Sequence, residues 1–321
     1  MAINHTEYNK KSIAVILCTK NGELFIDGQL KSIINQNHKN IDLYISDNSS
    51  NDKTVKKINK FIEKNKYNDT GVNIFLLRGD DLHFANNFIS LAQHISKEYN
   101  YYAFCDQDDI WEPNHILRAI IRLDNNKKSC PSLYCSRTSL INDGGLFIGH
   151  SKYFKKDPSF KNALVQSLAG GNTMVFNRQA YKLLLEVNPS KDFIPSHDWL
   201  LYLLVSAHKD GFICYEKTPS VQYRQHENNA IGSNTGFLSV AKRANHILQG
   251  TWSSWLEANY KILKNCSKIS DENMLLLNEF YELRNKNSAF LRIKKFLYLG
   301  IYRQTVFGNI SMGIALLIKK F

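Results

Sequence analysis

The sequence predicts an α/β fold in which a mixed, mainly parallel sheet is flanked by helices and followed by a helical C-terminal region. Between Ile13 and Leu123, short apolar runs alternate with segments of helical spacing, a pattern typical of parallel sheets. Each apolar run ends in polar, loop-forming residues, and in such sheets those ends meet at the ligand-binding edge. From about residue 232 the pattern is helical and strongly basic.

Four strands are predicted in the first part of the chain, and the first of them is a continuous apolar run, as expected for a strand buried on both faces. The four strands cover residues 13–18, 41–45, 72–77 and 101–105. The helices that follow them cover residues 23–34, 51–62, 84–95 and 116–123. Because strand–helix–strand connections are short and right-handed, we expect these strands to form one sheet.

The middle of the chain is less regular, with four short predicted strands and one helix. The strands cover residues 134–137, 146–148, 174–176 and 212–215, and the helix covers 198–207. We predict one domain over residues 1–232 and a basic, amphipathic helical region over residues 233–321, with no internal repeat.

Composition indicates a cytoplasmic protein. Apolar residues make up 43% of the chain, enough for a core without disulfides, and the six cysteines include no CxxC pair. Residues 1–11 are polar and carry no signal peptide, and no uncharged stretch is long enough to span a membrane. We therefore expect a reducing compartment.

The net charge of +12 suggests a polyanionic partner. No acidic residue follows Glu282, whereas basic residues there alternate with aromatic and aliphatic ones. This pattern favours an anionic membrane surface; the alternative is an ordinary packing helix with a solvated basic face. Since the basic residues cluster in an apolar tail and no recognition motif accompanies them, we expect no nucleic-acid partner.

Two carboxylates, Asp106 and Asp108, follow the fourth predicted strand. They would repel each other unless a cation lay between them, and hard oxygen ligands suit Mg²⁺ or Mn²⁺ bridging a diphosphate. The alternative is a solvated acidic turn in which Asp109 caps the next helix. The chain has no GxGxxG or GxxxxGK[ST] motif, which argues against other phosphate-binding loops.

Asp47 ends the second predicted strand, beside Thr19 and Asn21 at the end of the first. A carboxylate there can accept a hydrogen bond from a base N–H or a ribose hydroxyl. The alternative is a turn aspartate that satisfies local backbone groups.

Several segments resemble, in order, the motifs of family 2 glycosyltransferases with the GT-A fold. The opening segments are similar to the first- and second-strand motifs of the family, and the later ones to its rhamnosyltransferase-like branch. They are residues 13–23, 44–52, 104–111, 170–178, 197–199 and 223–229. The resemblance extends over about residues 12–232.

The resemblance implies a nucleotide-sugar site at the strand ends. Thr19, Asn21 and Asp47 would contact the nucleoside. Asp80 lies where the family's third strand meets the base or ribose, and Asp106 would face the ribose and the metal.

The resemblance also implies the metal ligands and the base. Asp108 would bind Mn²⁺ or Mg²⁺ with Asp106, and His226 matches a histidine that completes the metal shell in some relatives. Arg224 would point the same way as His226, towards the diphosphate. Asp198 matches the catalytic base, and an aspartate in the first turn of a helix also complements the helix dipole.

The acceptor is expected beside Gly170 and Gly171, where glycine lets the backbone approach closely, and beside Trp199, which could stack on a sugar ring. For the two glycines, the alternative is a tight turn before residue 172.

The leading hypothesis is an inverting transferase that takes L-rhamnose from dTDP-rhamnose to an oligosaccharide or lipid-linked saccharide in capsule or O-antigen synthesis. It would lie at the inner face of the cytoplasmic membrane, and its C-terminal helices could pair subunits. One alternative is a donor of the UDP-hexose or UDP-N-acetylhexosamine class. Another is an inactive nucleotide-sugar binding module.

Overall fold

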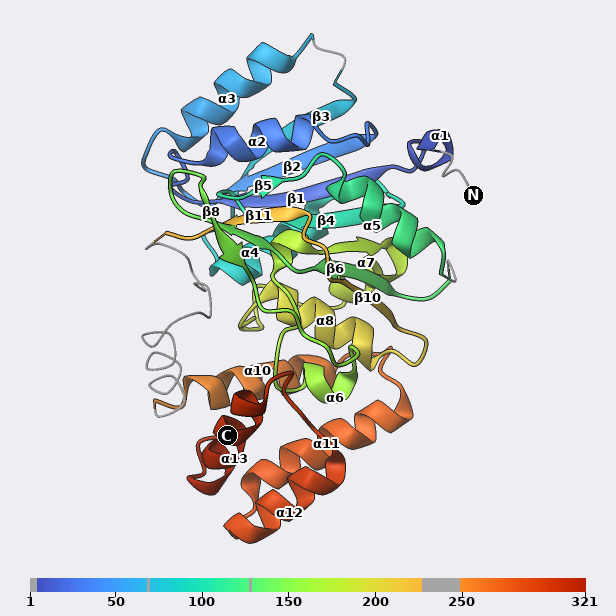
Figure 1. Cartoon of the computed structure of the whole chain (residues 1–321), viewed down its shortest axis with the longest axis vertical. Coiled ribbons are helices and arrows are strands. Elements are labelled where there is room, and N and C mark those ends of the chain that lie inside the picture. The colour runs from blue at the N-terminus through green and yellow to red at the C-terminus, as the bar shows by residue number, and fades with distance from the viewer. Residues whose placement is uncertain (1–4, 68–69, 127–128, 227–248) are drawn as a thin grey trace.

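The computed structural model describes residues 5–67, 70–126, 129–226 and 249–321. Its centre is a seven-stranded sheet with the strand order β10-β6-β9-β4-β1-β2-β3 (Figure 1). These strands are β1 (Ile13–Thr19), β2 (Ile41–Asp47), β3 (Val72–Arg78), β4 (Tyr101–Cys105), β6 (Ser132–Ser136), β9 (Val175–Asn177) and β10 (Phe212–Glu216). A second sheet has the order β5-β11-β7-β8. Its strands are β5 (Ile110–Trp111), β11 (Val221–Arg224), β7 (Ser139–Ile141) and β8 (Phe147–His150).

The predicted mainly parallel sheet is confirmed. β1 pairs in parallel with both β2 and β4, β2 with β3, and β6 with β10. Only β9 runs against its neighbours in this sheet, pairing antiparallel with β4 and β6. The carboxyl ends of β1, β2 and β4 therefore lie together.

Helices cover both faces of the large sheet, as Figure 1 shows. In the first part of the chain they are α1 (His5–Tyr8), α2 (Ile26–Ile34), α3 (Thr54–Asn65), α4 (Phe84–His94) and α5 (His115–Asp124). Further along are α6 (Phe160–Ala163), the 3-10 turn η1 (Gly171–Thr173), α7 (Arg178–Leu184) and α8 (His197–Ala207). Because side chains alternate along a strand, Val15 of β1 packs in the cluster with α2 and α5, and Ile16 in the cluster with α4 and α8.

The predicted strands and long helices are present with small shifts at their ends, whereas β5, β7, β11, α6 and α7 were not predicted. The unpredicted strands have two to four residues, too few to show a period of alternation. Pairing with strands distant in sequence forms them, as when β11 joins β5 and β7. The predicted boundary at residues 232/233 lies outside the described residues.

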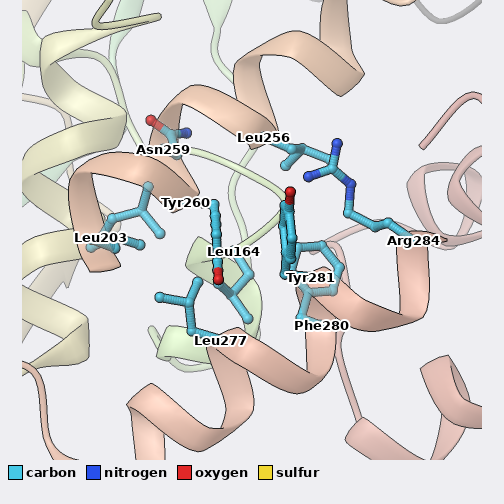
Figure 2. Close-up of a pocket in the computed structure, with 10 residues that line it drawn as sticks. Leu164, Leu203, Leu256, Asn259, Tyr260, Leu277, Phe280, Tyr281 and Arg284 are labelled. Atoms are coloured by element: carbon cyan, nitrogen blue, oxygen red, sulfur yellow. The ribbon is translucent and has the colours of Figure 1, made fainter. Parts of the chain in front are cut away.

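The C-terminal helices pack on the α/β body and form a lobe below α8 (Figure 1). They are α10 (Thr251–Lys264), α11 (Asp271–Asn285), α12 (Ala289–Leu299) and α13 (Val306–Leu317). Leu203 of α8 shares one apolar cluster with Leu256 and Leu277 of this lobe. A small pocket remains between these helices, and the stacked rings of Tyr260 and Tyr281 line it, 3.8 Å apart (Figure 2).

Arg292 joins α12 to α13. Its side chain is buried, and its Nε and Nη2 donate hydrogen bonds to the carbonyls of Leu316 and Leu317 at 2.7 and 3.0 Å. Its Nη1 donates to the carbonyls of Lys286 and Asn287 at 2.6 and 2.8 Å. The guanidinium thus satisfies carbonyls at the end of α13, where a cation also complements the helix dipole.

Replacing this guanidinium should destabilise the lobe. We expect Arg292→Met to lower the free energy of unfolding by about 3 kcal/mol, because several hydrogen bonds from a charged donor are lost and buried carbonyls are left unpaired. Lys294→Met, on the exposed side of the same helix, should change it by no more than ~0.5 kcal/mol. Urea denaturation measures both, and equal effects would contradict the bracing role.

Candidate active site

The carboxyl ends of β1 and β2 place Thr19 and Asp47 side by side, since these two residues are register partners. Asp47 is buried, and its Oδ2 accepts a hydrogen bond from the Ser50 N–H at 3.0 Å. Its Oδ1 is buried with no hydrogen-bond partner among the described residues. A buried acceptor is normally paired, so this oxygen fits a ligand N–H or O–H.

The loops that follow β1 and β2 are tied to each other through Asn21. Its backbone is left-handed, with φ of 51°, a conformation that asparagine tolerates. Its N–H donates to Ser50 Oγ, and its Oδ1 accepts from the Asn51 N–H, both at 2.9 Å. Asn21 therefore shapes the predicted nucleoside pocket, and its contact with the nucleoside stays a prediction.

Gln107, which sequence reasoning did not single out, ties the β1 loop to the β4 loop. Its Oε1 accepts from Thr19 Oγ1 at 2.6 Å and from the Lys20 N–H at 3.0 Å. A Cβ at Gly22 would lie 2.4 Å from the same oxygen. The residue between the two aspartates thus sets the distance between two loops of the site.

Asp80 lies in the exposed loop after β3, and its Oδ2 accepts a hydrogen bond from Ser90 Oγ of α4. The same loop is anchored to the end of β2, because the Gly79 N–H donates to the Asp47 carbonyl at 2.8 Å. Asp80 therefore belongs to a loop that is held beside the end of β2, and its contact with a base or ribose stays a prediction.

Carboxylates crowd the end of β4. Burial, followed by the charges of Asp108 and Asp198, raises the pKa of Asp106 to about 8. Burial and the charges of Asp108 and Asp106 raise the pKa of Asp109 well above its usual range. A cation at this place would relieve the repulsion and lower these pKa values.

Asp108 and His226 meet, although 118 positions separate them in the chain. The His226 Nε2 lies 2.7 Å from Asp108 Oδ2. The imidazole also stacks on Phe25, with ring centroids 5.1 Å apart. Across residues 5–67, 70–126, 129–226 and 249–321, no group of three or more His, Cys, Asp or Glu side chains could hold a metal ion.

Asp109 joins three parts of the site instead of capping a helix. Its Oδ2 accepts from Asn172 Nδ2 at 2.5 Å, and its Oδ1 accepts from the Arg224 N–H at 3.0 Å. The next helix, α5, has Asn114 at its N-cap position. Asp109 therefore links the β4 loop to the 170–173 segment and to β11. No sequence pattern indicates this linking role of Asp109, because both of its partners are distant in the chain.

Arg224 braces the aspartate loop. Its Nε donates to the Asp108 carbonyl at 3.0 Å, and its Nη1 donates to the carbonyls of Asn142 and Asp143 at 3.1 and 2.8 Å. The guanidinium also lies 4.7 Å from the Phe25 ring centroid. Arg224 and His226 thus both contact Asp108 and Phe25. The phosphate contact of Arg224 stays a prediction.

Asp198 lies in the first turn of α8, where its charge complements the helix dipole. It is buried, and its Oδ1 accepts from Ser196 Oγ and from the Trp199 N–H. Burial raises its pKa above the usual carboxyl range, against the opposing effect of these hydrogen bonds and one from the Gly171 backbone. A carboxylate with a raised pKa is a stronger base.

Comparison with known proteins identifies the family. Residues 14–184, more than half of the chain, match the family model described as glycosyl transferase family 2. The chain belongs to this family. The resemblance predicted from the strand-end motifs is confirmed.

Two curated relatives of this family 2 glycosyltransferase match most of the chain. The dTDP-rhamnosyl transferase RfbG of Shigella flexneri is 27% identical over 314 residues, which cover 89% of this chain and all of that protein. An uncharacterized glycosyltransferase of Haemophilus influenzae is 25% identical over 317 residues, covering 92% of this chain and 88% of that protein.

Solved structures show the same fold. The crystal structure of S. aureus TarS 1–349 with UDP-GlcNAc has a TM-score of 0.52 and 13% identity, covering 90% of each chain. The same protein with UDP has a TM-score of 0.53, covering 85% of this chain and 71% of that one. The predicted GT-A fold is confirmed.

The predicted acceptor residues of the glycosyltransferase fall into two groups. Gly170 is exposed and Gly171 is buried at the start of η1, near Asp198. Trp199 instead lies in the core, 5% exposed, and its Nε1 donates to the Ala163 carbonyl at 2.6 Å. This burial argues against the predicted stacking on a sugar, because the ring is packed and its N–H is already paired.

His197 precedes Asp198 in the first turn of α8, and its ring is buried. Its ring stacks on Phe88 at 3.8 Å between centroids and meets Phe104 edge-on at 4.8 Å. Burial lowers its pKa to about 3, so the ring is neutral. A Cβ at Gly171 would lie 2.2 Å from its Nε2.

This contact makes Gly171 sensitive to substitution. We expect Gly171→Ala to destabilise the protein by about 2 kcal/mol and to reduce transfer activity, because the packed His197 ring must shift and carry Asp198 with it. Gly28→Ala is the matched control, since a Cβ there meets nothing within 4 Å. Thermal unfolding and turnover are measured for both variants. Full stability and activity in Gly171→Ala would contradict the close packing.

Proposed function

We propose that this glycosyltransferase transfers L-rhamnose from dTDP-rhamnose to a saccharide acceptor, with inversion at the anomeric carbon. The donor assignment is carried by the full-length match to a protein described as a dTDP-rhamnosyl transferase. The transfer chemistry is supported by Asp198, a buried carboxylate with a raised pKa beside the aspartate cluster.

The nucleoside would lie over the ends of β1 and β2. The unpartnered Oδ1 of Asp47 would accept a hydrogen bond from the base or ribose. Thr19 and Asn21 shape the same pocket through their contacts with Gln107 and Ser50. Asp80 and Asp106 complete the proposed donor contacts.

The residues present fit Mn²⁺ or Mg²⁺ that is held partly by substrate phosphates. Asp108 and His226 supply an oxygen and a nitrogen donor at one place, and Asp106 is near enough for burial and the charge of Asp108 to raise its pKa to about 8. Such ions are commonly held by one or two carboxylates together with substrate phosphates. When bound, the ion would neutralise charge on the departing nucleoside diphosphate.

Asp198 would act as the general base. The acceptor hydroxyl oxygen forms a bond to the anomeric carbon, while the bond from that carbon to the diphosphate oxygen breaks. The hydroxyl proton passes to the Asp198 carboxylate, and the electron pair of the broken bond leaves with the diphosphate. Attack from the face opposite the leaving group inverts the configuration.

The acceptor would be an oligosaccharide or a lipid-linked saccharide of a capsule or O-antigen, bound near Gly170 and Gly171. The enzyme would then work at the inner face of the cytoplasmic membrane. Pairing of subunits and the absence of a nucleic-acid partner stay predictions.

A donor of the UDP-hexose or UDP-N-acetylhexosamine class is the second candidate, because the fold is shared with a protein crystallised with UDP-GlcNAc. An inactive binding module is disfavoured, since Asp106, Asp108 and Asp198 are all present.

Donor hydrolysis and binding test the proposal with dTDP-rhamnose, UDP-glucose, UDP-galactose and UDP-N-acetylglucosamine, each with and without Mn²⁺ or Mg²⁺. We expect metal-dependent turnover of dTDP-rhamnose and a loss of about 10³-fold in Asp198→Asn, which cannot accept the proton. Donor binding should survive in that variant. Turnover of a UDP-sugar alone would replace the donor, and no binding of any donor would favour the inactive module.

The proposed metal ligands have a separate test. We expect Asp108→Asn and His226→Gln each to raise the Mn²⁺ concentration for half-maximal turnover by about tenfold or more, as losses around metal sites do. Asp210→Asn is the control, because Asp210 is exposed in the turn after α8. A metal titration unchanged in both site variants would remove these residues from the metal shell.

A further inference from the structure

Large exposed apolar side chains are concentrated on the last two helices. Of the 19 such residues in the described part of the chain, ten lie on or directly after α12 and α13. We call these ten the α12–α13 surface. They are Phe290, Leu291, Leu297, Tyr298, Val306, Phe307, Ile310, Ile314, Leu317 and Ile318.

On α12 the exposed residues form one stripe. Phe290, Leu291, Leu297 and Tyr298 are exposed, and Lys294 lies between them at helical spacing. Tyr298 is 83% exposed. The inner face of the same helix carries the buried residues Arg292, Phe296 and Leu299. The helix is therefore apolar on both sides, and one of its apolar sides has no partner within the described part of the chain.

The helix α13 repeats this arrangement. Val306, Phe307, Ile310, Ile314 and Leu317 are exposed at spacings of three and four residues. Its inner face consists of Met312, Ala315 and Leu316, all fully buried. A soluble monomer rarely exposes so many contiguous large apolar side chains, which usually mark an interaction site.

The surface is rigidly supported. Arg292 ties α12 to the end of α13 through carbonyls of both segments. Phe321 anchors the chain end, with its ring edge-on to Trp252, Phe280 and Phe296. Both helices lie at the end of the molecule opposite α3 (Figure 1). The stripes therefore belong to a packed lobe.

The exposed charges on α12 and after α13 are basic, whereas Glu279 and Glu282 of α11 lie beside Lys295 of α12. No acidic residue follows Glu282, and Lys294, Lys319 and Lys320 are exposed. Two copies of this surface would bring like charges together, which disfavours self-association. An anionic bilayer complements both features, because lysines meet lipid phosphates while aromatic and aliphatic side chains enter the acyl boundary. No helix in the described ranges is long and apolar enough to cross a bilayer.

We propose that the α12–α13 surface docks this enzyme on an anionic lipid bilayer, with the two helices lying in the plane of the interface. This proposal deepens the proposed function, because a bilayer would also hold a lipid-linked acceptor. Its biological purpose therefore rests on the proposed function. The binding itself requires neither donor nor acceptor.

Co-sedimentation of the full chain with vesicles tests this proposal. One vesicle preparation is phosphatidylcholine alone, and the other is an equimolar mixture of phosphatidylcholine and phosphatidylglycerol. We expect binding to the anionic vesicles that weakens as salt rises, and much weaker binding to phosphatidylcholine. Phe290→Ser/Tyr298→Ser/Phe307→Ser should lower the partition coefficient by about tenfold or more, since three inserted rings are lost.

The matched control replaces three exposed apolar residues elsewhere, as Tyr67→Ser/Leu185→Ser/Leu275→Ser. It should bind vesicles as the wild type does. Lys294→Gln/Lys319→Gln/Lys320→Gln should lose the preference for anionic vesicles. Circular dichroism checks that each variant is folded, so that loss of binding reports on the surface.

Several outcomes would overturn the proposal: no vesicle binding by the wild type, equal binding by the aromatic triple variant, or equal binding to both lipids. A dimer in solution that the aromatic variant dissociates, without vesicle binding, would assign the surface to a second copy. Failure of the proposed transfer is distinguishable, because donor turnover is measured without vesicles and vesicle binding without donor.

Discussion

The accumulation of negative charge at the end of β4 is the constraint on which the rest of the site depends. Asp106, Asp108 and Asp109 follow one another closely in the chain. Asp198 is near enough in space that its charge helps to raise the pKa of Asp106. Protein groups compensate part of this charge. Asn172 and the Arg224 N–H satisfy Asp109, and the N-terminus of α8 favours Asp198. Asp106 and Asp108 lie at the edge where a diphosphate and a cation would meet, and His226 contacts Asp108 there.

Some polar residues of the site position its loops and would not take part in the chemistry. Gln107 and Asn21 join loops from different strands, and Arg224 fixes the aspartate loop against the turn before β8. Their hydrogen bonds position the groups that would face a ligand. Among these groups, the Asp47 Oδ1 is buried without a hydrogen-bond partner in the described residues. Preorganised polar groups of this kind cost little reorganisation during a reaction. His197 would position the neighbouring Asp198, because its ring is packed against Phe88.

The C-terminal lobe extends the same core and does not form an independent tail. Leu203 of α8 contacts the apolar cluster of the lobe, and Asn162 donates to the Tyr302 carbonyl at 3.0 Å. The lobe is thus held in place relative to α8, whose first turn carries Asp198. A surface on α12 and α13 would consequently orient the active site with respect to whatever it binds.

The sequence by itself determined the alternation of strands and helices, the collection of polar residues at one sheet edge, the aspartates after β4 and the family. These are local patterns, which periodicity and short motifs record. Tertiary structure alone decided the roles of Asp109, Gln107 and Trp199. Trp199 packs inside because the whole first part of α8 is buried, and Asp109 pairs with Asn172 and Arg224, which are 63 and 115 positions away. Pairing over such separations depends on how strands and helices pack, and no local pattern encodes it.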